Sequence, residues 1–249
     1  MLVGEGPADG KGWWDPAISP NGSQLAYGTR MPGARAMRPI FVVSVADGTS
    51  QKLGDDCGGR PRQWVDDRLL VIERFARLNT IAIIDTVTGV QRELLESSDR
   101  SVKNPRVSPD GRSIAFDAAR PGETPSVLVA PLGERAPIPE SEWVVVDRLA
   151  SHPFWSADSR MLYYLPTGGH APVRSVVVRA RHIAHASGLP EGEPIAVYSS
   201  IEMMMPAFLS GTAPIATSDQ IIFVLGDFRG DVWLMELEPD QHKPAANSD

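Results

Sequence analysis

Two histidines three positions apart, His182 and His185 in the segment RHIAHASG, are the first pair whose type and spacing could do chemistry. On a helix this spacing would place both imidazoles on one face, as a metal site requires. No acidic or thiol side chain accompanies them, and Arg179 and Arg181 would repel a cation. The single cysteine, Cys57, cannot form an internal disulfide or a thiolate site. We therefore predict no metal ion and no cofactor, and we interpret the histidine segment as a solvated insertion loop.

The sequence lacks the short motifs that mark common catalytic sites. No Gly-x-Ser-x-Gly nucleophile elbow occurs, and no alternation of strands and helices would carry one. A Gly-x-x-x-x-Gly-Lys phosphate loop does not occur either. An Asn-Gly-Ser glycosylation pattern begins at Asn21, but it coincides with a turn motif that explains it first. We predict that the chain is not an enzyme.

The charge balance excludes two classes of partner. The formal charge is −7 and the pI is about 5.3, and no basic stripe that could follow a phosphate backbone is visible. No run of 18 apolar residues occurs, and the first residues lack the pattern of a signal peptide. We expect no nucleic-acid binding and no membrane insertion. The expected location is cytoplasmic for the chain as given, or periplasmic if it is a fragment of a larger protein.

Short strands joined by tight turns must position any site in this chain. The turn motif Ser-Pro-Asn/Asp-Gly ends at Gly22 and Gly111, and related turns end at Asp67, Ser159 and Asp219. In chain order the first four turns end at residues 22, 67, 111 and 159, which are 45, 44 and 48 residues apart. The step to the fifth turn is longer because it contains an insertion. A period of about 40 to 50 residues is the size of one four-stranded propeller blade.

Each unit of this period has the same internal layout. An apolar strand follows the turn, then a variable loop, a second strand rich in β-branched residues and a weaker outer strand, which reads as all-β. The one helical candidate, RARHIAHASGL, is too short to change the class. The predicted apolar strands are Leu25–Tyr27, Leu69–Ile72, Ile114–Phe116, Met161–Leu165 and Ile221–Leu225.

The repeated turn motif has a structural explanation. Proline presets φ at the first corner, Asn or Asp bonds to the nearby backbone, and glycine accepts a positive φ at the exit. We therefore assign turn chemistry rather than catalysis to six residues, namely Pro20, Asn21, Gly22, Pro109, Asp110 and Gly111.

The repeated stretches resemble the TolB-like, WD-repeat-like bacterial propeller family, whose blades carry the signature [FW]-S-P-D-G-x-x-[IL]-[AV]-[FY]. Residues 108–116 are similar to it, residues 19–27 nearly as much, and residues 154–164 with Ala-Asp-Ser in place of Pro-Asp-Gly. The last third is similar to the carboxy-terminal end of propellers in large bacterial proteins. Such proteins often carry a serine/threonine kinase or a winged-helix domain ahead of the propeller. The resemblance implies a scaffold or sensor module and transfers no catalytic residue.

We expect a single β-propeller domain of about five four-stranded blades over residues 1–249. The approximate blades are 13–54, 60–97, 103–146, 151–199 and 213–238. Family propellers usually have six or more blades, so two alternatives stay open. The chain either closes as a five-bladed ring or forms part of a larger one. In a closed ring, residues 1–3 would complete the last blade by pairing with residues 233–237, which would remove two exposed edges.

The loops that lead from an outer strand to the next innermost strand emerge beside the central channel of a propeller. Aromatic and arginine side chains there are typical anchors of protein contacts. Trp14, Lys103 and Ser151 belong to these loops, and inter-blade packing is the alternative role for Trp14 and Trp155. The candidate contact residues on this rim are Trp13, Asp15, Arg60, Arg62, Asn104 and His152.

These expectations combine into a non-catalytic binding, scaffold or sensor module that presents one rim to a protein or peptide partner. Two alternatives remain open. One is the accessory, gating propeller of a peptidase or hydrolase whose catalytic domain lies elsewhere. The other is a periplasmic docking factor of the TolB-like kind. Since a fold does not determine a function, the choice between these functions depends on the residues of the rim.

Overall fold

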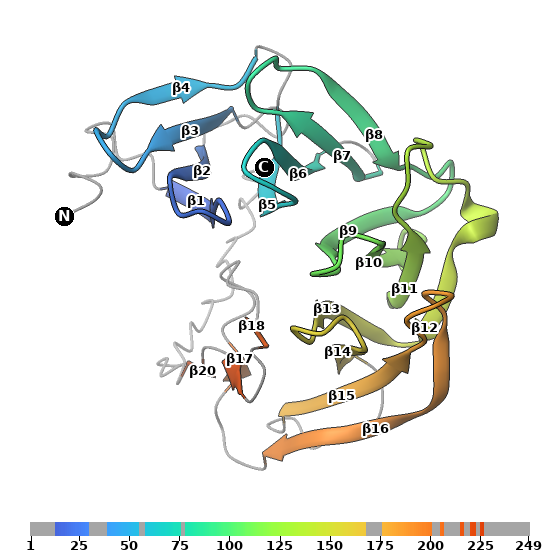
Figure 1. Cartoon of the computed structure of the whole chain (residues 1–249). Coiled ribbons are helices and arrows are strands. Elements are labelled where there is room, and N and C mark those ends of the chain that lie inside the picture. The colour runs from blue at the N-terminus through green and yellow to red at the C-terminus, as the bar shows by residue number, and fades with distance from the viewer. Residues whose placement is uncertain are drawn as a thin grey trace, which may run out of the picture.

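The computed structural model describes residues 13–29, 39–54, 58–75, 78–167, 176–200, 205–206, 215–216, 220–222 and 225–226 (Figure 1). Its main elements are four antiparallel four-stranded sheets, which we call blades 1 to 4. The sheets follow one another in an arc, with the first strand of each on the inside and the last on the outside (Figure 1). The chain is therefore an all-β partial β-propeller with about four blades, and the fold class predicted from the sequence is confirmed.

The strands of each blade run from the inside outward in chain order. Blade 1 holds β1 (Trp13–Ile18), β2 (Gln24–Thr29), β3 (Ile40–Ser44) and β4 (Ser50–Lys52). Blade 2 holds β5 (Arg60–Trp64), β6 (Leu69–Arg74), β7 (Thr80–Asp85) and β8 (Gln91–Leu95). Blade 3 holds β9 (Ser101–Val107), β10 (Ser113–Ala119), β11 (Ser126–Pro131) and β12 (Val144–Asp147), with a 3-10 turn at Glu140–Glu142. Blade 4 holds β13 (Ala150–Trp155), β14 (Met161–Pro166), β15 (Val176–Ile183) and β16 (Pro190–Ser200).

The turns between the first two strands of a blade follow from their sequence. Gly22 and Gly111 have φ values of 72° and 71°, in the region that favours glycine. In blade 3 the Ser108 hydroxyl donates to the Asp110 carboxylate over 2.6 Å, and the Ser113 amide donates to the Ser108 hydroxyl over 3.0 Å. These bonds close the hairpin from within, so its amino-acid types are used for turn geometry.

The apolar cores lie between neighbouring sheets rather than in one centre. In β6, Leu70 and Ile72 pack toward blade 1, whereas Val71 packs toward blade 3. In β10, Phe116 belongs to the core shared with blade 2 and Ala115 to the core shared with blade 4. Because successive side chains of a strand point to opposite faces, each blade contributes to the cores on both of its sides.

Two tryptophans at equivalent positions tie the blades together in pairs. The Trp64 indole N–H of blade 2 donates to the Ala17 carbonyl of blade 1 over 2.9 Å. The Trp155 indole N–H of blade 4 donates in the same way to the Arg106 carbonyl of blade 3 over 2.9 Å. Trp155 thus makes an inter-blade contact, while the side chain of Trp14 lies outside the described residues.

A second link joins the turns of the same blade pairs. The Asn21 amide donates to the Asp67 carboxylate over 3.0 Å, and the Asp110 amide donates to the Ser159 hydroxyl over 3.0 Å. Asp67 and Ser159 end the two turns that depart from the glycine motif. Their side chains therefore accept the amide of the preceding blade, which a glycine could not do.

The segment RARHIAHASGL, interpreted as an insertion loop and named as the one helical candidate, begins as a strand and contains no helix; only its second half is a turn. Residues 179–183 belong to β15, which pairs with β16 as a long hairpin through a turn in which Gly188 has φ 68°. His182 lies on β15 and His185 in the turn after it, so the two imidazoles do not share the helix face that a metal site at this spacing would require. Among the described residues no cluster of histidine, cysteine and acidic side chains could hold a metal ion.

Two short strand pairs follow blade 4, and three of their four strands fall in the range 213–238 predicted for a fifth blade, which stays a prediction as a four-stranded sheet. β17 (Met205–Pro206) pairs with β20 (Leu225–Gly226), and β18 (Ile215–Ala216), which lies near β13, pairs with β19 (Ile221–Ile222). The strands proposed for ring closure, residues 1–3 and 233–237, lie outside the described residues. No helix within the described ranges is long and apolar enough to cross a membrane.

Candidate functional site

Three of the four innermost strands contain the same strained step. Asp15, Asn104 and His152 each precede a proline, and their φ values are 52°, 51° and 57°. Each lies where the pairing with the second strand shifts register. Asn, Asp and His tolerate the left-handed region better than most residues do, which explains these three types. A bulge of this kind redirects a side chain out of the regular alternation.

Blade 2 places arginines at the corresponding part of its innermost strand. In β5 the register shifts between Pro61 and Gln63, around Arg62. The Gln63 side chain continues into blade 3, where it donates to the Val107 carbonyl over 3.0 Å and accepts the Val107 amide over 2.9 Å. The paired main chain of blades 2 and 3 thus holds Arg62 beside the bulge of β9.

An ion-pair network joins blades 1 and 2 through these residues. The Arg60 Nε lies 3.2 Å from the Asp15 carboxylate, and Arg62 lies 3.8 Å from the same group. Arg62 Nε also lies 3.5 Å from the carboxylate of Glu73, and its guanidinium donates to the Asn104 side-chain oxygen. The side chains of Asp15, Arg62 and Glu73 are only 5%, 6% and 3% exposed, so the pairs are shielded from solvent.

Asp117 of β10 extends the network to blades 3 and 4. Its carboxylate accepts the Asn104 amide Nδ2 over 2.7 Å and the backbone N–H of His152 over 3.0 Å. Burial raises the pKa of Asp117 to about 7, although both hydrogen bonds oppose that shift. Burial lowers the pKa of His152 to about 4, and the positive charges of Arg62 and Arg106 add to this effect. His152 is therefore neutral at pH 7.

Arg106 of β9 lies in the same cluster with a different set of contacts. Its guanidinium donates to the carbonyl of Pro105 over 2.9 Å. Burial, together with the positive charge of Arg62, lowers the pKa of Arg106 to about 9, although the charges of Glu73, Asp117 and Asp15 oppose that shift. Within the described part of the chain, no carboxylate lies within ion-pair distance of this guanidinium.

The cluster contains a serine beside a histidine, but their contacts do not form a hydrolytic triad. The Ser151 hydroxyl lies 2.9 Å from His152 Nδ1. Asp117 contacts His152 through the backbone N–H, so this carboxylate does not orient the ring as the acid of a triad does. Ser151 is buried, and its geometry fits a structural hydrogen bond.

The structure brings five of the six rim residues of the sequence analysis into one network, namely Asp15, Arg60, Arg62, Asn104 and His152. Trp13 begins β1 opposite Thr29, and its side chain lies outside the described residues. Whether this network contacts a partner stays a prediction.

Sequence reasoning missed Glu73, Asp117 and Arg106. A signal for the first two was present, because each is an acidic residue inside an otherwise apolar strand, LLVIER or SIAFDAA. Both stand four residues after the first residue of their strands, β6 and β10. An equal position in two repeats places two carboxylates at the same height in neighbouring blades.

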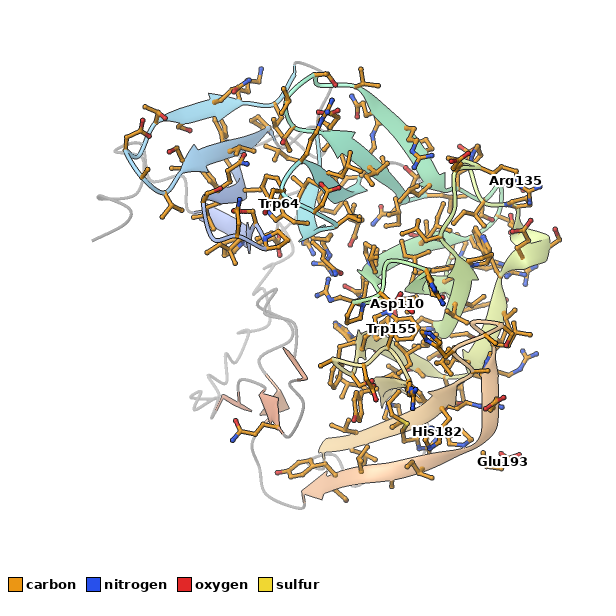
Figure 2. The ribbon with its side chains drawn as sticks, viewed as in Figure 1. Trp64, Asp110, Arg135, Trp155, His182 and Glu193 are labelled. Atoms are coloured by element: carbon orange, nitrogen blue, oxygen red, sulfur yellow. The ribbon has the colours of Figure 1, made fainter. Side chains whose placement is uncertain are left out.

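A hollow lies between blades 3 and 4, beside the turn that contains Asp110. It has a volume of about 200 Å³ and is lined by Asp110, Arg112, Trp155 and the β15–β16 turn. His185 Nδ1 lies 3.6 Å from the Asp110 carboxylate, and Arg112 lies 3.3 Å from His185 Nε2. Figure 2 shows Asp110 and Trp155 together between these blades and His182 away from them on β15. Asp110, Arg112 and His185 thus lie beside one another in the lining of this hollow.

No family model matches the sequence, and no curated protein is significantly similar to it. Solved structures with the same fold do exist. A putative TolB from Agrobacterium tumefaciens is 18% identical with a TM-score of 0.56 over 74% of this chain and 64% of that one. TolB from Acinetobacter baumannii is 15% identical with a TM-score of 0.54, covering 79% and 46%. A puromycin hydrolase is 14% identical with a TM-score of 0.64, covering 86% and 35%.

These likenesses concern the fold, and each covers only part of the solved structure. The chain spans between about one third and two thirds of the length of these three structures. Both TolB proteins and a hydrolase share this propeller arrangement, so the fold alone does not select between binding and catalysis.

Proposed function

We propose that the chain is a non-catalytic propeller module that binds a protein or peptide partner at the inner ends of its blades. The observation that carries this proposal is the convergence of charged and polar side chains from four blades on one place. Asp15 comes from blade 1, Arg62 from blade 2, Asn104 from blade 3 and His152 from blade 4. Residues far apart in sequence thereby form one preorganised cluster, most of it shielded from solvent, beside which the partly exposed Arg60 lies.

The strained backbone supports a binding role for this end of the molecule. Three non-glycine residues with positive φ lie here, one in each of blades 1, 3 and 4. Such conformations cost free energy and concentrate at functional sites. Arg60, with 31% of its side chain exposed, offers a charged group of the network to a partner.

The test is a selection from a display library of random peptides with the full 249-residue chain as the bait. The selected peptides are then titrated against Arg60→Ala and against Arg92→Ala, a matched control whose guanidinium donates to the Glu134 carbonyl away from the network. We expect the first variant to weaken binding by about 10-fold and the second to leave it unchanged. Equal affinities for all three proteins, or turnover of a hydrolase substrate panel by the chain alone, would refute the proposal.

A second candidate function is the accessory propeller of a peptidase. The observation in its favour is the likeness to puromycin hydrolase, which extends over 86% of this chain but only 35% of that one. The rest of such a protein would carry the catalytic groups. An open reading frame for an α/β-hydrolase domain continuous with this chain would support this candidate, and a kinase or winged-helix domain would support the sensor role.

A further inference from the structure

Arg106 differs from the other two arginines of the inner network in its contacts. Arg60 and Arg62 both lie within ion-pair distance of Asp15, and Arg62 also of Glu73. Within the described residues, the guanidinium of Arg106 makes one hydrogen bond, which one terminal nitrogen donates to the carbonyl of Pro105. A guanidinium has five N–H donors, so most of those on Arg106 are unused by the described residues.

The unused donors of Arg106 are accessible. The buried side-chain nitrogens that make no hydrogen bond include Nε of Arg60 and Nε of Arg62, but no nitrogen of Arg106. Arg106 is a partly exposed residue, so its remaining N–H groups face space that a ligand atom can reach. Its backbone is held in place by the indole of Trp155, which donates to the Arg106 carbonyl. The group is thus fixed, charged and reachable.

The nearby carboxylates are already used by other groups. Asp15 pairs with Arg60 and Arg62. Glu73 accepts from the Asn79 side chain over 3.2 Å and from the backbone amide of Asn104 over 3.3 Å. Asp117 accepts from Asn104 and His152. The charges of Glu73, Asp117 and Asp15 act on Arg106 from a distance, but within the described residues none of these carboxylates makes an ion pair with it. A poorly solvated cation without a direct ion pair gains from a carboxylate supplied by a ligand.

We propose that Arg106 anchors a subsite for a carboxylate group of the partner peptide. This inference rests on the proposed function, because it names the chemistry of the group that the inner end of the blades recognises. The planar fork of a guanidinium matches the two oxygens of a carboxylate, which is the anionic group of unmodified peptides. The carboxylate comes from an Asp or Glu side chain or from the chain terminus.

The experiment uses the same display library and the full chain, and it scores the composition of the selected peptides. We expect Asp and Glu to be enriched in peptides selected with fixed amidated ends. The best peptide is then synthesised in three forms: amidated, amidated with its acidic residues changed to Gln or Asn, and with a free C-terminal carboxylate. Loss of about 10- to 100-fold in affinity on removing the acidic side chains assigns them as the ligand group. A gain of that size from the free terminus assigns the terminus.

Arg106→Gln should remove this discrimination, so that charged and neutral forms bind alike. Arg106→Lys should retain part of it, because the charge remains while the fork is lost. Arg92→Gln, a solvent-exposed arginine change, should retain all of it. Urea unfolding followed by tryptophan fluorescence establishes that each variant is folded. If Arg106→Gln does not fold, Arg106→Lys serves as the test. A smaller affinity difference between charged and neutral peptides than in the wild type supports the subsite, and an unchanged difference overturns it.

The outcomes separate this inference from the proposed function. Two results would overturn the carboxylate subsite and leave the binding function standing. The first is a set of selected peptides that bind at the network without any enrichment of acidic groups. The second is an Arg106→Gln variant that discriminates charged from neutral peptides as strongly as the wild-type protein does. A chain that selects no peptide at all would overturn both proposals.

Discussion

The stability of the protein should be nearly independent of pH between about pH 4 and about pH 6.5 as far as the inner network is concerned, because two of its buried groups act in opposite directions. These groups are Asp117 and His152. Each single substitution, Asp117→Asn or His152→Asn, should remove one of the two opposing effects and leave the pH dependence of stability that the other residue causes. Asn suits position 152 because Asn104 occupies the same bulge in blade 3 with a similar φ.

The sign of the Asp117 contribution follows from its raised pKa of about 7, against 3.8 for the free group. Between these values the folded protein binds a proton that the unfolded chain has released, so stability falls as pH rises. The stabilising contribution of Asp117 is fully present below about pH 3.8 and is lost above about pH 7. The whole contribution is about 4 kcal/mol, of which about 3 kcal/mol falls between pH 4 and pH 6.5.

His152 acts in the reverse sense, since its pKa is lowered to about 4 from 6.5. Between these values the unfolded chain binds a proton that the folded protein does not, so stability is lost as pH falls. This contribution is also about 3 kcal/mol over the same window. The remaining charges of the network, on Glu73, Arg62, Arg106 and Asp15, are common to the wild type and both variants.

The assay is urea unfolding, followed by tryptophan fluorescence, at several pH values across this window. Relative to the wild type, Asp117→Asn should gain about 3 kcal/mol from the lower to the upper end, and His152→Asn should lose about as much. The double variant should run parallel to the wild type. Curves for the two single variants that stay parallel to the wild type would refute the assignment of opposing buried groups.

Four further substitutions, one of them with a matched control, test the packing around the site. Trp155→Phe should cost about 1 to 3 kcal/mol in urea unfolding, since it leaves the Arg106 carbonyl without its indole donor, and Trp64→Phe should cost a similar amount; no loss in either would contradict the inter-blade link. Gly59→Ala should lower Tm by many degrees because its Cβ would lie 2.3 Å from a backbone carbonyl oxygen, whereas Gly133→Ala, with open space around it, should not. Asp15→Ala should cost about 3 to 5 kcal/mol by leaving two arginines without their shared carboxylate, and added salt should not restore the loss.

The propeller fold could be predicted from the sequence because its signal is local and repeated. Turn residues at regular spacing and apolar strands after them were sufficient, and the observed β2, β6, β10 and β14 begin directly after those turns. The interpretation of residues 179–189 as an insertion loop missed the strand in its first half, because a segment this short gives only a weak periodic signal. Its alternation of arginine with small or apolar residues, in VRARHI, was the better guide to a strand.

The candidate site could be predicted only in part. Loop positions near the axis pointed to Asp15, Arg62 and His152, since blade topology alone brings those segments together. Glu73 and Asp117 lie within strands that read as buried, and each accepts a backbone N–H from the next blade, that of Asn104 for Glu73 and that of His152 for Asp117. The ion pairs depend on bulges that turn side chains toward the axis, and a one-residue shift of register is not visible in composition or period.

Under the proposed function, the network of Asp15, Arg60, Arg62, Glu73, Asn104 and Asp117 serves recognition more than it serves to hold the blades together. Three apolar cores and two indole links already join neighbouring blades, so the architecture does not depend on buried charge. A buried ion pair is weak evidence for stability, because well-packed apolar residues of similar volume often do as well or better. Here the charges also require three residues with positive φ, which add a conformational cost. A sequence that needed only stability would fill this space with apolar side chains. The retention of ions and strain together at the inner ends is therefore best explained by a ligand that meets them there.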